Sequence, residues 1–130
     1  MTWDEQIATR TLWAECRGEP EDGQRAVAHV LWNRLAVGLW GSSLASVCLW
    51  PYQFSCWNTD DKQRRRMAAM TDDDPALAAM RHVLMQAKMR KDDPSKGACF
   101  YHADYVNPSW AEKMRFTARI GRHLFYSDKA

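Results

Sequence analysis

The first 20 residues predict a helix whose start and end are both marked by the sequence. Thr2 followed by Glu5 has the form of a capping box, which satisfies the free amide groups at the start of a helix. Gly18 and Pro20 end the helical pattern at about Arg17. The direction of each side chain between these limits follows from the helical repeat.

Glu15 falls on the apolar side of this helix. The residues that share its face are Ile7, Ala8, Thr11 and Leu12. A carboxyl group among such neighbours loses water, which favours its neutral form. A carboxylic acid that keeps its proton near neutral pH can protonate a departing sugar oxygen. The residues alone leave a second interpretation open, in which Glu15 lies at the edge of the stripe and bonds Arg17 or solvent.

The rest of the chain predicts a mainly helical fold with a minor antiparallel part. Between residues 37 and 61, glycines, serines and Pro51 break both the helical and the strand period, which indicates an irregular segment over the core or along a cleft. The other expected elements are helices over about residues 22–35 and 75–91, a strand over 98–102, a helical turn over 110–115 and a hairpin over 116–126. The fold class is therefore α+β, mainly α, and 130 residues fit one domain.

Charge and composition exclude several classes of protein. The 18 Lys and Arg against 16 Asp and Glu give a net charge of +2, which is too mild to identify a nucleic-acid binder, and no nucleic-acid partner is expected. The basic run at residues 62–66 is expected to be a solvated face rather than a polyanion site. No apolar run approaches the roughly 18 residues of a membrane-spanning helix. Four cysteines without a CxxC pair, and no export signal, favour reduced thiols. The missing signal indicates either synthesis in a cytoplasm or a domain cut from a longer protein.

Other catalytic constellations have little support. The four histidines lack the His-x-x-x-His spacing of a helical metal site, so no metal is expected. There is no Gly-x-Ser-x-Gly elbow and no phosphate-binding glycine loop. Cys99 with His102 leaves a thiol nucleophile open, although strand residues three apart point to opposite faces. Glu19 is a possible second carboxylate beside Glu15, or it caps the second helix at its positive end.

Three stretches together resemble the cell-wall hydrolase family of the spore cortex-lytic enzymes. The matching residues are 15–20 with 23–28 and 33–34, then 51–57, then 101–102, 108–110 and 120–126. They span almost the whole chain in the order of the family. The spore enzymes usually carry a signal and a separate wall-binding module, which this chain does not show. A stand-alone domain of this kind is similar to endolysins of bacteriophages that infect Gram-negative hosts.

The resemblance implies a lysozyme-like fold, with a helical body and a small antiparallel sheet beside a substrate groove. It also implies cleavage of peptidoglycan between N-acetylmuramic acid and N-acetylglucosamine, by a lytic transglycosylase or a muramidase that spans residues 1–130 as one catalytic domain. The first glutamate of the family motif is the catalytic acid, which corresponds to Glu15. If water attacks, Glu19, Asp60 or Asp61 is needed as a second carboxylate.

Aromatic and amide side chains near the second and third motifs are candidates for the groove walls. One wall is expected to contain Gln53, Phe54, Ser55 and Trp57, and the opposite wall Tyr101 and His102. The Tyr101 phenol is a candidate to steady Glu15. Phe54 and Trp57 fit an ordinary core position equally well.

The resemblance also shapes the expected biology. We expect a monomer without a cofactor or stable membrane insertion, which acts on peptidoglycan in the periplasm or cell wall. If the chain is phage-borne, a separate membrane-permeabilising protein is its partner in host cell lysis. Two alternatives stay open: a wall peptidase or amidase that uses Cys99 and His102, and a non-catalytic wall-binding module whose tryptophans hold sugars.

Overall fold

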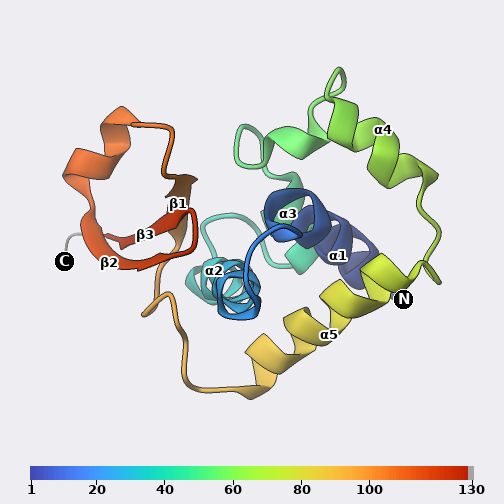
Figure 1. Cartoon of the computed structure of the whole chain (residues 1–130), viewed down its shortest axis with the longest axis horizontal. Helices are drawn as coiled ribbons and strands as arrows, with labels where there is room; N and C mark the ends of the chain where they lie inside the picture. Colours follow the sequence, from blue (N-terminus) through green and yellow to red (C-terminus); the bar gives the residue numbers. More distant parts are fainter. Residues whose placement is uncertain (129–130) are drawn as a thin grey trace.

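The computed structural model describes residues 1–128 and confirms a mainly helical α+β fold (Figure 1). The α-helices of this range are α1 (Trp3–Cys16), α2 (Glu21–Val37), α3 (Leu44–Leu49), α4 (Lys62–Ala69) and α5 (Pro75–Met89). Two short 3-10 helices are η1 (Ser55–Trp57) and η2 (Ser109–Lys113). The strands are β1 (Phe100–Ala103), β2 (Arg115–Ile120) and β3 (His123–Ser127).

The predicted capping box starts α1. The Thr2 hydroxyl accepts a hydrogen bond from the Glu5 amide at 3.1 Å, and Glu5 Oε1 accepts one from the Thr2 amide at 3.1 Å. The buried residues of α1 include the four that were expected to share a face, namely Ile7, Ala8, Thr11 and Leu12. The apolar face of α1 therefore points into the core, as the helical spacing predicts.

Helix α2 lies between the sheet and the other helices (Figure 1). It packs against α5, α3 and α1 on one side and reaches β2 on the other. The Trp32 indole nitrogen donates a hydrogen bond to the Leu84 carbonyl at 2.9 Å, which joins α2 to α5. Gly38 ends α2 with a φ of 83°, a left-handed conformation that favours glycine. The predicted helices over residues 22–35 and 75–91 are thus confirmed as α2 and α5.

The segment over residues 37–61 was expected to be irregular, but it contains α3 and η1. The Ser43 hydroxyl accepts a hydrogen bond from the Ser46 amide at 3.1 Å and so caps the start of α3. Leu44 and Val47 are buried on one face of this helix. Its six residues are too few for a helical period to stand out in the sequence, so the prediction missed it.

The sheet is antiparallel with the order β1–β3–β2. β2 and β3 form the predicted hairpin, and Gly121 at its turn has a φ of 57°. Tyr101 of β1 pairs with Phe125 of β3, whose side chain is fully buried. This register turns the ring of Tyr101 toward the helices.

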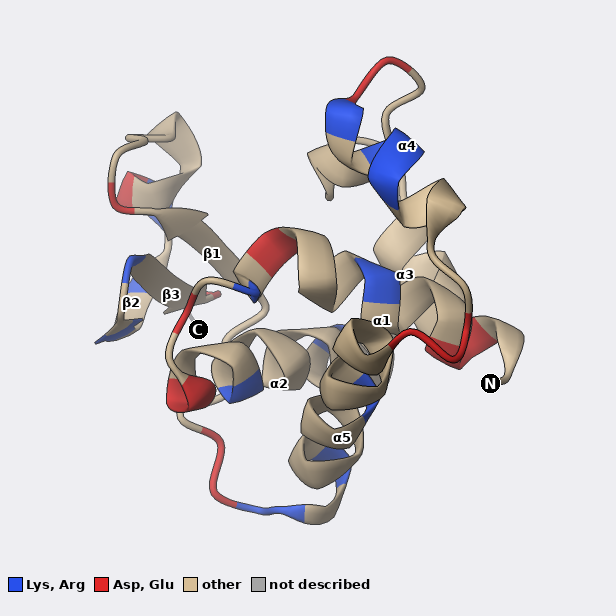
Figure 2. Ribbon diagram, turned by 45° about the vertical axis from the view of Figure 1, so that its right-hand side comes forward, with Lys and Arg blue, Asp and Glu red and all other residues tan. Residues whose placement is uncertain are grey.

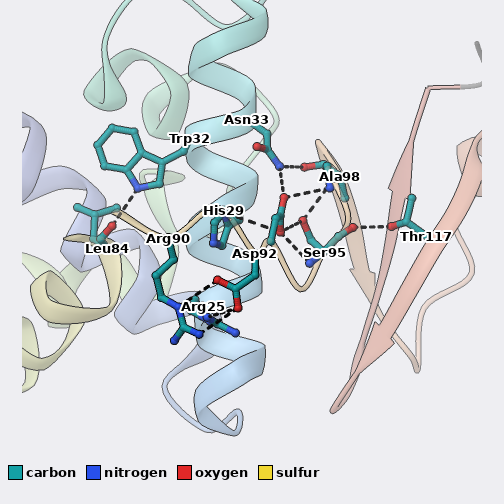
Figure 3. Close-up of polar contacts among 12 residues, drawn as sticks. Arg25, His29, Trp32, Asn33, Leu84, Arg90, Asp92, Ser95, Ala98 and Thr117 are labelled. Carbon is teal, nitrogen blue, oxygen red and sulfur yellow. Dashed lines mark hydrogen bonds and ion pairs between the residues drawn. The ribbon is translucent and has the colours of Figure 1, made fainter. Parts of the chain in front are cut away.

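The loop between α5 and β1 is fixed to α2 by Asp93. The Asp93 carboxylate accepts hydrogen bonds from the Asn33 side chain at 2.9 Å and from the Ser95 and Gly97 amides at 2.8 and 3.0 Å. The Thr117 hydroxyl of β2 donates to the Ser95 carbonyl at 2.8 Å. Figure 3 shows how Asn33, Ser95 and Thr117 join α2, the loop and the sheet. This network sets the position of β1, and hence of Tyr101, relative to the helices.

Thiols, basic side chains and helix lengths complete the description of residues 1–128. All four cysteines are free thiols. Lys and Arg gather on α4, at the end of the molecule away from the sheet (Figure 2), and Arg64, Arg65 and Arg66 are exposed there. Within residues 1–128, no helix has the length and apolar character needed to span a bilayer. No group of side chains in this range has the arrangement of a metal site.

Candidate active site

A cleft of about 420 Å³ opens where α1 ends beside the sheet. It is lined by the last turn of α1, the connection to α2, and parts of the sheet. Its lining residues are Ala14, Glu15, Cys16, Arg17, Gly18, Glu19, Ala103, Tyr105, Arg122 and His123. We call this the Glu15 cleft. Both glutamates of the motif at residues 15–19 therefore face the same cleft.

The Tyr101 hydroxyl donates a hydrogen bond of 2.5 Å to Glu15 Oε1. No other hydrogen bond to Glu15 Oε1 or Oε2 occurs among the described residues, so Oε2 is available to carry a proton. The Tyr101 phenol itself keeps its proton, because burial and the nearby Glu15 charge raise its pKa well above the ordinary value. Tyr101 therefore fixes one carboxyl oxygen and leaves the other without a hydrogen-bond partner among the described residues, on a side chain that lines the cleft.

The pKa of Glu15 is raised above its ordinary value. Burial is the largest cause, since it removes water from the ionised form. The Tyr101 hydrogen bond and the positive charge of Arg34 oppose this shift, while the negative charge of Asp61 adds to it. The half-buried Glu15 carboxyl thus sits in surroundings that favour the neutral acid, which is the environment that the helical spacing of α1 predicts.

Glu19 is held by the hairpin turn of the sheet. Its Oε1 accepts a hydrogen bond of 2.8 Å from the Arg122 amide and lies 3.6 Å from Nδ1 of His123. A Cβ atom on Gly121 would lie 2.7 Å from this oxygen, so the close approach requires glycine. The alternative that Glu19 caps the second helix does not describe this geometry, because Pro20 precedes α2 and no side chain caps it.

His123 is neutral in the floor of the cleft. Burial lowers its pKa, and the nearby Glu19 opposes this shift. Its Nδ1 is buried without a hydrogen-bond partner among the described residues. The ring lies against Tyr101, with 4.9 Å between ring centroids. His123 therefore packs behind the Tyr101 phenol.

A second pocket of about 400 Å³ has Tyr101 in its lining. It is lined by Arg34, Tyr52, Gln53, Phe100, Tyr101, Trp110 and Met114, and we call it the Arg34 pocket. Gln53 accepts a hydrogen bond of 3.1 Å from Nη1 of Arg34. Gln53 and Tyr101, expected on opposite groove walls, thus line one pocket, and the Tyr101 hydroxyl links this pocket to Glu15 of the other cleft.

The other residues expected on the same wall as Gln53 line neither the Glu15 cleft nor the Arg34 pocket. The Phe54 side chain is 5% exposed and packs in the core, with its ring centroid 5.3 Å from the Arg34 guanidinium carbon. Trp57 donates a hydrogen bond of 2.9 Å to the Thr11 hydroxyl and lines a different pocket beside α4. Ser55 is exposed at the start of η1. Phe54 therefore lies in the core and Trp57 packs against it, which agrees with the alternative that these residues have ordinary core positions.

His102 points away from Tyr101 on β1. Its Nε2 lies 2.8 Å from the Tyr126 hydroxyl, and its ring stacks on that of Tyr126. The Cys99 thiol is half-buried, and burial raises its pKa, which disfavours a thiolate. No hydrogen bond joins Cys99 to His102 within residues 1–128. These features do not favour the peptidase or amidase alternative.

Arg34 and His123 were not predicted to be site residues, although both lie in segments that resemble the family. Arg34 continues the core spacing of Val27, Val30 and Leu31 on α2, and this spacing is the signal that could have marked it as buried. His123 is brought to the cleft by the turn at Gly121 and by pairing with β1, which no local pattern reveals.

The fold and the cleft define the chain as a lysozyme-like domain. It superposes on the catalytic domain of the germination-specific lytic transglycosylase SleB from Bacillus anthracis with a TM-score of 0.77, at 23% identity over 98% of this chain and 97% of that one. The catalytic domain of the Bacillus cereus SleB protein superposes with a TM-score of 0.76, at 24% identity over 95% of this chain and 89% of that one.

The family follows from the sequence match. Residues 18–126 match the Cell Wall Hydrolase family, and the chain belongs to it. It is 32% identical to the spore cortex-lytic enzyme of Halalkalibacterium halodurans over 123 residues. This match covers 94% of this chain and 34% of that protein. It is 30% identical to the spore cortex-lytic enzyme of Bacillus subtilis, in a match that covers 94% of this chain and 37% of that protein. The chain thus spans little more than a third of these relatives. The resemblance seen in the motifs is confirmed.

Proposed function

We propose that residues 1–130 form one catalytic domain that cleaves the glycan strand of peptidoglycan between N-acetylmuramic acid and N-acetylglucosamine. The observation that carries this proposal is the Glu15 carboxyl, shielded from water in a cleft and held at one oxygen by Tyr101. The names of the relatives and of the similar solved structures support a cortex-lytic or lytic transglycosylase activity.

In the first step, neutral Glu15 acts as a general acid. The proton on Oε2 passes to the glycosidic oxygen as the bond between that oxygen and the sugar C1 breaks. The sugar is left as an oxocarbenium-like cation, and Glu15 is left as a carboxylate. The Tyr101 hydrogen bond strengthens as Oε1 gains charge, so the tyrosine stabilises the ionised state.

In the second step, the 6-hydroxyl of the same sugar attacks C1. The Glu15 carboxylate takes the hydroxyl proton, which restores the neutral acid and leaves a 1,6-anhydro sugar end. One carboxyl serves both steps because the acid and base roles follow each other.

The hydrolytic alternative needs a second carboxylate to activate water. Glu19 faces the same cleft, but its Oε1 is engaged by the Arg122 amide. Asp61 accepts a hydrogen bond from the Gln63 amide at the start of α4, and Asp60 is exposed. This arrangement favours the intramolecular route over the muramidase route.

The test is the Glu15→Gln variant on purified sacculi. We expect a folded protein, by circular dichroism, with about 100- to 10,000-fold lower activity, the usual contribution of a general acid. Glu21→Gln, on the exposed first turn of α2, is the matched control. Mass spectrometry of the wild-type products distinguishes anhydro ends from hydrolysed ends. An active Glu15→Gln variant, or peptide products alone, would contradict the proposal.

We further propose that the chain acts as a monomeric bacteriophage endolysin, made in the host cytoplasm and dependent on a separate membrane-permeabilising protein. Expression in a Gram-negative host tests this proposal. Cells that express the chain alone should stay intact, and cells that also express a permeabilising protein should lyse. Prompt lysis by the chain alone would contradict it.

A further inference from the structure

The Arg34 pocket contains a positive charge that the general-acid mechanism does not use. Arg34 lines the pocket, yet the residue is only 5% exposed. Charged side chains are seldom buried this deeply unless they are paired with an opposite charge. The partners of Arg34 therefore decide what the pocket can bind.

The polar partners of Arg34 are neutral. Its Nε donates a hydrogen bond of 2.7 Å to the Cys99 carbonyl, and its Nη1 donates one of 3.1 Å to Gln53 Oε1. The faces of three rings surround the guanidinium carbon at 4.8 to 5.5 Å, those of Trp40, Phe54 and Phe100. Within residues 1–128, no ion pair joins Arg34 to a carboxylate. Among the described residues the guanidinium therefore has no carboxylate in direct contact, and the Glu15 charge acts on it only through space.

The position of this charge relates it to the cleavage site. Tyr101 lines the Arg34 pocket with its ring and contacts Glu15 with its hydroxyl. The Arg34 charge is close enough to lower the pKa of Glu15. A glycan strand that crosses the Glu15 cleft can therefore place a substituent of a neighbouring sugar in the Arg34 pocket.

The walls of the pocket are aromatic. Trp110 and Phe100 lie 5.9 Å apart between ring centroids, and both line the pocket. The Tyr52 side chain is fully exposed, and its φ of 66° is a left-handed conformation that is unfavourable for tyrosine. Rings in this arrangement can hold a sugar or a short peptide beside the charge.

We propose that the Arg34 pocket binds a carboxylate attached through the lactyl ether of muramic acid. This inference rests on the proposed function. The sugar rings of the strand carry hydroxyl and N-acetyl groups, so the lactyl substituent is where a negative charge can enter. The charge is the lactyl carboxylate itself in a peptide-free strand, or a carboxylate of the stem peptide in a substituted strand. Arg34 gives either anion a charge-assisted hydrogen bond.

The test compares matched pairs of glycan oligomers with the wild-type protein. One pair is peptide-free and carries the lactyl group as the carboxylate or as its methylamide. The other pair carries the stem peptide with its carboxylates free or amidated. We expect a kcat/KM about 10- to 100-fold higher for the charged member of at least one pair, the size of a charge-assisted hydrogen bond. The pair that shows the difference identifies the source of the carboxylate.

The Arg34→Met variant assigns the effect to this residue. It keeps an unbranched side chain but removes the guanidinium and its charge, so the ratio between charged and neutral members should fall close to one. Arg10→Met is the matched control, because Arg10 is also a mostly buried arginine bonded to backbone carbonyls, and it lies beside α4 instead. The control should keep the wild-type ratio.

The outcomes separate this inference from the proposed function. Equal kcat/KM values within both pairs for the wild-type protein would overturn the carboxylate subsite while glycan cleavage stands. A charge preference that Arg34→Met retains would also overturn it. If Arg34→Met does not fold, the wild-type comparison alone decides. No cleavage of any oligomer or of sacculi would instead reject the proposed function.

Discussion

Removal of the Tyr101 hydroxyl tests how the chain tunes its acid. In Tyr101→Phe, Glu15 Oε1 loses the hydrogen bond of 2.5 Å that stabilises its charged form. Burial, the largest cause of the raised pKa, stays in place. The pKa of Glu15 should therefore rise further. Since the neutral carboxyl is the active form, activity falls as the pH rises through this pKa, and the alkaline limb of the profile should move to higher pH.

The size of the shift follows from the contact that is lost. The structure gives Glu15 one hydroxyl donor, and a hydrogen bond to a charged group contributes about 1.5 to 3 kcal/mol. Because about 1.4 kcal/mol corresponds to one pKa unit, the limb should move by about one to two pH units. The rate at the optimum should also fall by about tenfold, because the carboxyl is no longer held in one orientation.

The assay is kcat/KM for release of soluble fragments from purified glycan strands, measured across pH. Tyr126→Phe is the matched control, since the Tyr126 hydroxyl contacts His102 on the other face of the sheet. Its profile should coincide with that of the wild-type protein. A limb that does not move in Tyr101→Phe, or that moves to lower pH, would refute the reasoning.

Two further predictions concern the cleft and the thiols. Gly121→Ala should lower the free energy of unfolding by about 1 to 2 kcal/mol, because its Cβ would lie 2.7 Å from Glu19 Oε1 at a positive φ. Thermal melts should show a smaller effect for Gly97→Ala, which has a positive φ but open space, and equal melting temperatures for the two would contradict the clash. Alkylation of the native protein with iodoacetamide should leave glycan cleavage largely intact, since burial raises the pKa of Cys99, and loss of cleavage on alkylation would favour a thiol mechanism.

Local patterns predicted most of the fold because they act within single elements. The capping box at Thr2 and the spacing on α2 mark helices directly, and Gly121 marks the hairpin turn. Helix α3 was not predicted, because it has only six residues and depends on the cap at Ser43 and on burial against α1 and α2. Burial of this kind comes from tertiary packing and leaves little trace in so short a sequence.

The candidate site was only partly predictable, because it is assembled over long distances in the chain. The position of Glu15 follows from helical spacing, and its proximity to Tyr101 was suggested only by the family resemblance. The two residues are 86 positions apart in the chain, and the Asp93 network and the pairing of β1 with β3 bring them together. The partners of Glu19 and the burial of Arg34 depend on the same long-range contacts, so periodicity could not reveal them.

A titration of the Glu15 carboxyl carbon by ¹³C NMR, assigned by comparison with Glu15→Gln, tests the central claim most directly. We predict a pKa above the ordinary value of 4.5, because burial outweighs the Tyr101 hydrogen bond and the Arg34 charge. A pKa at or below 4.5 would show that the carboxyl is ionised near neutral pH, and Glu15 would then not be the proton donor.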